Sequence, residues 1–459
     1  MNTPICDFVR RYRASDPVRM HMPGHKGVAL TGPEASDITE ITGADALYSA
    51  RGIIRESEEN AAGRFGSART VYSAEGSSLC IRAMLHLAGL HAAENGIPRR
   101  VLAARNAHQA FMTAAALLDL EVDWIFPSPE EGLLACRVKP ETVEKKLARG
   151  EYMAVYLTSP DYLGNLQDIR AIASVCRRQG VPLLVDNAHG AYLKFLPEDR
   201  HPISLGADLC CDSAHKTLPC LTGAAYLHIS QAAPEEWRSR ADQAMRLFAS
   251  TSPSWLILQS LDRANEELAG GYPGRLREAV SRTDALKGRL CAAGWQIAGD
   301  EPMKITLDAR KRKIPGGELQ SMLRSAGIEC EFADRDHLVL MPSPYTSDGE
   351  WNRLEAALLS LPEGSAQWES PCLVAPPQKA VSVREAMLSP WEMVPVERAA
   401  GRILADPCVS CPPAVPVLMA GERITEEAVQ SFLYYGVAEC AVMMRGLGRS
   451  VASVHKQAP

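Results

Sequence analysis

The chain has 459 residues, of which 46% are hydrophobic and 23% charged, and its net charge is −6. This length is too great for one ordinary core and predicts two or three domains. The acidic balance argues against nucleic acid as a partner, and we find no apolar run of about 20 residues that would cross a membrane. The 13 cysteines, an odd number, favour reduced thiols in a cytoplasm over a disulfide framework.

Residues 1–55 are rich in Gly, Pro and His, and we expect an irregular N-terminal segment there, without the apolar centre of a secretory signal. Short apolar runs bounded by turn residues then predict strands at 99–105, 121–127, 152–160, 181–188, 207–215 and 223–230. Helical patterns lie between several of them, at 107–119, 140–150 and 166–180. This alternation predicts an α/β fold with a mostly parallel sheet between two layers of helices.

The pattern changes after this core and suggests further domains. We predict a large α/β domain at 56–265, a smaller α+β domain at 266–360, a linker at 361–380 and a C-terminal domain at 381–459. Cys408 and Cys411 form a C-x-x-C pair in the last of these. A zinc site would need a second pair or histidines at matching spacing nearby, so we predict no metal.

Polar side chains follow three of the predicted strands, in "LTSPDY", "VDNAHG" and "CDSAHK". In such sheets, ligands bind at the carboxyl ends of the strands. Asp186 and Lys216 each follow a strand and are 30 residues apart, about one helix plus one strand. A lysine there can form a Schiff base, and a carboxylate can keep a pyridine nitrogen protonated, which together suit pyridoxal phosphate (PLP). His189 could orient Asp186 or face the substrate.

A PLP phosphate also needs a binding site. In the stretch "SAEGSSLCIRAMLHLAGL" (73–90), small residues come just before an amphipathic helix. A helix N-terminus of this kind binds anions. We predict that the phosphate contacts involve Gly76, Ser77, Ser78, Ser213 and His215, and that His108 stacks on the ring face.

Each feature alone has a plainer explanation. Ser77 and Ser78 could simply cap a helix, Asp186 could be a turn residue, and His108 could be a capping or surface histidine. The order of the features is more specific than any one of them, because it runs from helix start to histidine, strand–Asp and strand–Ser-x-His-Lys.

These residues resemble the Orn/Lys/Arg decarboxylases, PLP-dependent enzymes of the aspartate-aminotransferase fold (fold type I). The motifs "HMPGHKG" (21–27), "SAHKTLPCLTG" (213–223) and "PPAVPVLMAGERIT" (412–425) carry the resemblance. It is closest to the short form without the N-terminal wing domain. It implies α-decarboxylation of arginine, lysine or ornithine to a polyamine-precursor amine, in the cytoplasm.

The resemblance also assigns roles. Lys216 would be the Schiff-base lysine, Asp186 the partner of the pyridine nitrogen, and His108 the stacking residue, with His189 beside the cofactor. "STSPSW" (250–255) would face the neighbouring subunit, so that Thr251 or Ser252 completes the partner's phosphate site in a homodimer.

The sequence departs from the family pattern at Glu75, Asn187, Trp255 and Ala414. It does not identify the acid that binds the distal cation of the substrate, for which Glu397 and Glu422 are weak candidates. An aminotransferase or PLP lyase on the same fold is the alternative, and it would need an arginine for a second carboxylate. A catalytically silent relative would tend to lose Lys216 or Asp186, and both are present.

Overall fold

The computed structural model describes residues 2–128, 131–132, 134–368, 376–407 and 415–444. The C-x-x-C pair Cys408 and Cys411, and the departure at Ala414, lie outside these described residues. No helix within the described ranges is both long enough and apolar enough to cross a membrane.

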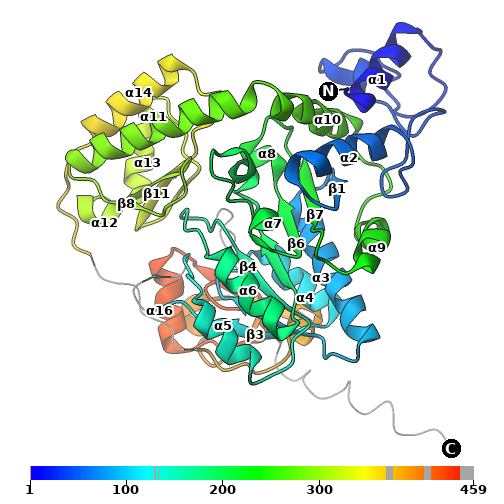
Figure 1. Cartoon of the computed structure of the whole chain (residues 1–459). Coiled ribbons are helices and arrows are strands. Elements are labelled where there is room, and N and C mark those ends of the chain that lie inside the picture. Colours follow the sequence, from blue (N-terminus) through cyan, green and yellow to red (C-terminus); the bar gives the residue numbers. More distant parts are fainter. Residues whose placement is uncertain (1, 129–130, 133, 369–375, 408–414, 445–459) are drawn as a thin grey trace, which may run out of the picture.

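A seven-stranded sheet forms the centre of the large domain, with strand order β1-β7-β6-β5-β4-β2-β3 (Figure 1). Strands β2 to β6 run parallel, and β7 runs antiparallel to both of its neighbours. The bounds are β1 (Arg69–Ser73), β2 (Arg100–Ala104), β3 (Glu121–Ile125), β4 (Ala154–Thr158), β5 (Leu183–Asp186), β6 (Leu209–Asp212) and β7 (Ala225–Ile229). The predicted α/β fold and mostly parallel sheet are confirmed, and β1 is a strand that the sequence pattern did not reveal.

Both faces of this sheet are buried, which explains why its strands read as continuous apolar runs. Leu184 of β5 packs into one core cluster, whereas Leu183 and Val185 pack into another on the opposite face. The first cluster includes residues of α3 (Ser77–Glu94), α4 (Gln109–Leu118) and α9 (Glu235–Arg246). The second includes residues of α5 (Pro140–Leu147) and α6 (Ile169–Gln179), and α7 (Pro202–Leu205) contacts α6.

The N-terminal segment is more ordered than expected, because Pro4–Ala14 form helix α1. Ile5 and Val9 are one helical turn apart and pack into a core shared with neighbouring helices. These neighbours are α2 (Ile53–Phe65) and α10 (Trp255–Ala269), and a short 3-10 helix, η1 (Pro33–Ser36), follows α1. The expectation of an irregular segment was wrong for residues 4–14, because the Gly residues of the segment lie after this stretch and its one proline is at the helix start, where proline is tolerated.

Helix α11 (Tyr272–Ala292) leads from α10 into the smaller domain (Figure 1). That domain has an antiparallel sheet of β8 (Ile297–Ala298), β9 (Ile305–Asp308), β10 (Phe332–Ala333) and β11 (His337–Leu340), with helices α12 (Ala309–Arg312), α13 (Gly316–Ser325) and α14 (Asp348–Ser360). The C-terminal part contains β12 (Trp391–Pro395), β13 (Leu404–Asp406), β14 (Glu439–Met443), α15 (Val383–Leu388), η3 (Val396–Arg398) and α16 (Glu426–Tyr434). The three sheets fall within three of the predicted domain ranges, whose boundaries remain predictions.

A tight turn follows β5 and leads into η2 (Ala191–Phe195). The Asn187 N–H donates to the Cys211 carbonyl at 2.9 Å, and the Gly190 N–H donates to the Asn187 carbonyl at 2.8 Å. A Cβ on Gly190 would lie 2.0 Å from Oδ1 of Asn187 and 2.7 Å from Cδ of Pro160. The turn therefore has room only for glycine at position 190.

We predict that Gly190→Ala lowers the free energy of unfolding by about 2 kcal/mol, because the added methyl group must displace Asn187 or Pro160. Urea unfolding would measure the loss. Gly288→Ala in the interior of α11 is the control, since no heavy atom lies within 4 Å of its Cβ position. That change should raise stability by about 0.5–1 kcal/mol. Equal effects of the two changes would contradict the packing argument.

Candidate active site

Lys216 lies on the short helix α8 (Ala214–Thr217), which follows β6 directly. Its Nζ is 3.0 Å from Nε2 of His189, which the turn after β5 presents. The parallel arrangement of β5 and β6 brings these two side chains to the same edge of the sheet. The predicted proximity of "DNAHG" and "DSAHK" is therefore present in the structure.

Asp186 is the last residue of β5 and is 2% exposed. Its carboxylate accepts hydrogen bonds from the Tyr156 hydroxyl at 3.1 Å, the Ala188 N–H at 3.2 Å and the Cys211 thiol at 3.6 Å. These three donors orient the buried carboxylate and satisfy both of its oxygens. Tyr156 was not predicted as a site residue, since it reads as one more apolar position in the β4 run.

His108 is the N-cap of α4, and its Nδ1 accepts a hydrogen bond from the Ala110 N–H at 3.0 Å. The proton of a neutral ring must then lie on Nε2. Burial lowers the pKa of His108, the Asp186 carboxylate raises it and Lys216 lowers it. His108 is therefore close enough to Asp186 and Lys216 for their charges to affect its pKa. His108 also caps helix α4, which is the simpler role that the sequence allowed for it.

The N-terminus of α3 faces the same part of the structure. Gly76 is its N-cap with φ 74°, a conformation that favours glycine, and it has no side chain that could cap the helix. The Ser213 hydroxyl donates to Oγ of Ser77 at 2.8 Å, which joins α3 to the segment after β6. Ser78 follows on α3. The ring nitrogen Nδ1 of His215 donates to the Ala224 carbonyl at 2.9 Å and so fixes that side chain.

Thr251 and Ser252 are exposed. The N–H of the preceding residue, Ser250, donates to Oε1 of Glu75 at 2.8 Å, next to Gly76 of the same chain. The segment thus lies beside the loop that precedes α3, with its hydroxyl-bearing residues on the surface.

A second lysine, Lys304, approaches the site from the smaller domain. Its Nζ is 3.4 Å from Nδ1 of His189, 3.3 Å from the Asp161 carbonyl oxygen and 3.0 Å from Oε2 of Glu301. Tyr162 packs edge-on against the His189 ring, with the centroids 5.1 Å apart. Sequence reasoning missed Lys304, although a lysine that opens the apolar strand "KITLD" is a signal of a buried, paired cation.

Behind the site, Asp212 is the centre of a fully buried polar network. Its carboxylate accepts hydrogen bonds from Nε2 of His201 at 3.0 Å and Nε2 of His228 at 3.2 Å. It also accepts one from Nδ2 of Asn187 at 2.6 Å. Although burial opposes ionisation, His201 and His228 hold the pKa of Asp212 well below its ordinary value. This network joins the end of β6 to the residue that follows Asp186.

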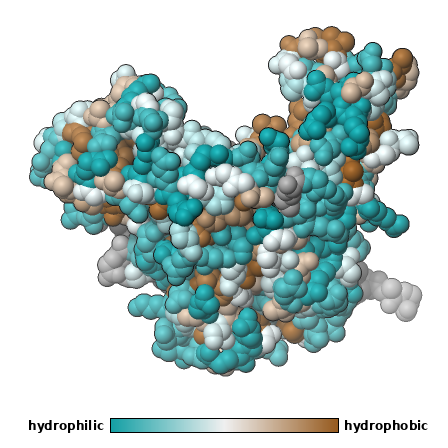
Figure 2. Space-filling view, turned by 45° about the horizontal axis from the view of Figure 1, so that its top comes forward, coloured by the Kyte–Doolittle hydropathy of each residue, from teal (hydrophilic) through white to brown (hydrophobic). Residues whose placement is uncertain are grey.

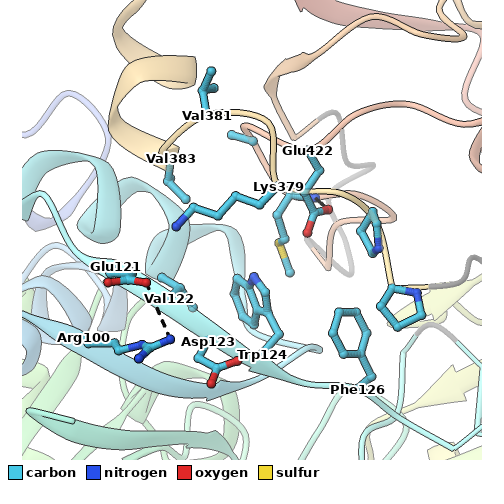
Figure 3. A pocket seen from close by; sticks show the side chains of 14 residues that line it. Arg100, Glu121, Val122, Asp123, Trp124, Phe126, Lys379, Val381, Val383 and Glu422 are labelled. Atoms are coloured by element: carbon cyan, nitrogen blue, oxygen red, sulfur yellow. Dashed lines mark hydrogen bonds and ion pairs between the residues drawn. The ribbon is translucent and has the colours of Figure 1, made fainter. Parts of the chain in front are cut away.

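Neither acid suggested for the distal cation of the substrate is supported. Glu422 binds Arg105 through two hydrogen bonds of 2.8 and 2.6 Å, which occupy both carboxylate oxygens. It lines a pocket between β3 and the C-terminal part of the chain, beside Trp124, Phe126 and Lys379 (Figure 3). Glu397 is exposed on η3. Glu422 is therefore a structural ion-pair partner, and Arg105 is unavailable for a second substrate carboxylate.

The residues fit PLP in their chemistry. The open N-terminus of α3 and the joined hydroxyls of Ser77 and Ser213 offer the donors that a phosphate would need. The buried carboxylate of Asp186 ends β5, and the amine of Lys216 follows the neighbouring strand β6. His108 and His189 complete this set.

Comparison with known proteins gives consistent matches. The family model for the Orn/Lys/Arg decarboxylase major domain matches residues 3–309, and the model for the C-terminal domain matches residues 366–452. The chain is 30% identical to the uncharacterized protein YaaO of Bacillus subtilis, over 94% of this chain and 93% of that protein. It is 27% identical to the arginine decarboxylase of the same organism, over 93% and 92%. The structure of a lysine decarboxylase from Francisella novicida matches with a TM-score of 0.77 at 16% identity, over 96% of this chain and 81% of that one.

We predict that Asp212→Asn lowers the free energy of unfolding by about 3 kcal/mol, because it removes the charge that accepts three buried N–H groups. Asp348→Asn is a control, since the ion pair of Asp348 with Arg282 is largely exposed and should contribute less than about 1 kcal/mol. Denaturant unfolding of both variants would compare the losses. A loss at Asp212 as small as that at Asp348 would show that the network is not energetically coupled to the fold.

Proposed function

The chain belongs to the Orn/Lys/Arg decarboxylase family and is a decarboxylase of basic amino acids, and we propose that it uses PLP and acts on arginine. The observation that carries the proposal is the placement of Lys216 beside His189, one strand away from the buried carboxylate of Asp186. The names of several relatives favour arginine over lysine or ornithine. The amine product would be a polyamine precursor.

The bound cofactor would supply an electron sink for the pair of electrons left by CO2. In this chain, Lys216 would bind it covalently and Asp186 would hold a proton on the pyridine nitrogen. The hydrogen bonds from Tyr156, Ala188 and Cys211 keep the Asp186 carboxylate in place for this task. His108 would lie against the ring, and Lys216 or His189 would return a proton to the substrate carbon.

The phosphate group would bind at the N-terminus of α3 with Ser77, Ser78 and Ser213, and His215 nearby. Backbone N–H groups at a helix N-terminus and two hydroxyl groups suit a dianion. The hydrogen bond between Ser213 and Ser77 supports this assignment, because it shows that the two hydroxyls converge.

A homodimer would complete the site. Large apolar side chains of the N-terminal segment are exposed, with Val18 at 81%, Met20 at 85% and Leu30 at 76%, and apolar atoms gather on this lobe in Figure 2. Such a patch on a soluble protein commonly marks an interface. Thr251 and Ser252 are exposed as well and so could reach a partner's phosphate site.

The cofactor and substrate assignments predict a specific label and a specific product. Borohydride reduction of the PLP-loaded protein, followed by peptide mapping, should place the pyridoxyl group on Lys216. A CO2-release assay over arginine, lysine and ornithine should give the highest kcat/KM for arginine, and Lys216→Ala should lose turnover. Lys287→Ala is a control, because that lysine donates to the Glu301 carbonyl away from the strand ends. Label on another lysine, or a keto acid instead of CO2, would contradict the proposal.

Composite sites predict complementation between two inactive variants. Lys216→Ala and a double change, Thr251→Ala with Ser252→Ala, should each be inactive alone. In a mixed dimer, one site would carry both defects and the other would be intact. Random exchange of equal amounts makes half of the dimers mixed, so about a quarter of all sites should regain activity. No recovery, with subunit exchange shown by mass spectrometry, would mean that each chain builds its own phosphate site.

A further inference from the structure

The two nitrogens of His189 face two different lysines. Nε2 is 3.0 Å from Nζ of Lys216, and Nδ1 is 3.4 Å from Nζ of Lys304. Burial lowers the pKa of His189 well below its ordinary value, and the Lys304 ammonium lowers it further, so the ring is neutral. A neutral imidazole has one donor and one acceptor nitrogen, whereas an ammonium group can only donate. Only one of the two lysines can therefore bond to this ring as an ammonium.

Lys304 has the surroundings of an ammonium group. Its side chain and that of Glu301 are each 1% exposed, with Nζ 3.0 Å from Oε2 of Glu301. The Asp161 carbonyl oxygen, 3.3 Å away, is another acceptor, and the Tyr162 ring lies 5.9 Å from Nζ. A buried charge is tolerated when it is paired in this way. Nδ1 of His189 must then accept from Lys304, which leaves the ring proton on Nε2.

We propose that Lys304 fixes His189 as the tautomer protonated on Nε2 and thereby holds Lys216 as a neutral amine. In this arrangement Nε2–H donates to the lone pair of Nζ of Lys216. The inference rests on the proposed function, in which Lys216 binds the cofactor aldehyde. Only a neutral amine can do so: its lone pair forms the C=N bond, and its two hydrogens leave with the aldehyde oxygen as water.

Lys304 acts here as a positioning residue, because it is buried and bonds to Nδ1 of His189, whose other ring nitrogen faces Lys216. Other charged or titratable groups also face this region and contribute to the electrostatic potential at the ring. They are Asp186 and His108 from the ends of β5 and α4, His215 from α8, Tyr162 from the loop after β4, and Glu301 from the smaller domain. Glu301 also accepts a hydrogen bond from the Tyr192 hydroxyl, which fixes its carboxylate.

The tautomer can be measured in the cofactor-depleted protein, without any turnover. Solid-state NMR of protein labelled with ¹⁵N in its histidine rings distinguishes protonated from unprotonated ring nitrogens. Subtraction of the His189→Gln spectrum identifies the His189 signals among those of the 11 histidines. We expect an unprotonated Nδ1 and a protonated Nε2 in the wild-type protein. The opposite tautomer would overturn the proposal without any need for a variant at Lys304.

The second measurement is the rate at which the depleted protein captures PLP, followed by the visible absorbance of the lysine-bound cofactor. Lys304→Met removes the donor to Nδ1 and should move the ring proton toward Nδ1. Lys216 could then bond to Nε2 only as an ammonium, and capture should slow by about tenfold, as for a rise of one unit in an amine pKa. A double change, Lys304→Met with Glu301→Gln, should behave alike and avoids leaving Glu301 as an unpaired buried charge.

Lys287→Met is the matched control. This lysine donates to the Glu301 carbonyl at 2.8 Å and not to the His189 ring, so both the tautomer and the capture rate should stay at wild-type values. Unchanged ring signals in both Lys304 variants would overturn the proposal. A changed tautomer with unchanged capture would overturn its second half, the control of Lys216. Failure of the CO2 assay with the expected tautomer intact would count against the proposed function alone.

Discussion

The hydrogen bond between Asn187 and Asp212 joins the carboxyl ends of β5 and β6. Asn187 directly follows Asp186, and Asp212 lies four residues before Lys216 along the chain. This buried contact therefore helps to hold together the two segments that carry the proposed cofactor-binding groups, in addition to the backbone bonds of the parallel pair. This side-chain bond and the backbone bond from the Asn187 N–H to the Cys211 carbonyl fix the relative position of the two loops that follow these strands.

This contact is itself supported from behind. His201 and His228 donate to the other oxygen of Asp212, and the ring of Phe65 packs against both imidazoles. His201, His228 and Asp212 are away from solvent, so their hydrogen bonds must come from within the protein. The orientation of Asn187 is thus set through Asp212 and the two histidines by the packing of Phe65, a residue of α2. The turn after β5 is therefore anchored to the core between the sheet and α2.

The sequence predicted the parts of the site that follow strands, and it did so for a physical reason. Lys216, Asp186 and His189 each come directly after an apolar run, and parallel strands end at one edge. Lys304 escaped prediction because its strand belongs to another sheet, and only the packing of the smaller domain against the loop at 161–164 brings it to His189. Helix α1 escaped because its core residues, Ile5 and Val9, are stabilised by packing against α2 and α10, which local patterns do not reveal. The roles proposed for Thr251 and Ser252 require a second chain and stay predictions.

The buried charges near the site are better explained by their effect on the orientation of neighbouring side chains than by a contribution to the stability of the fold. A buried ion pair such as Lys304–Glu301 gains little net stability over apolar residues of the same size, since desolvation offsets the attraction. Removing one partner of the pair costs much stability, because the other charge is then buried without a partner. An apolar pair at these positions would fill the same space between the domains, but it could not donate to Nδ1 of His189. The ion pair therefore supplies a fixed proton donor at a seam between two domains, where packing alone would leave the protonation of the imidazole undetermined.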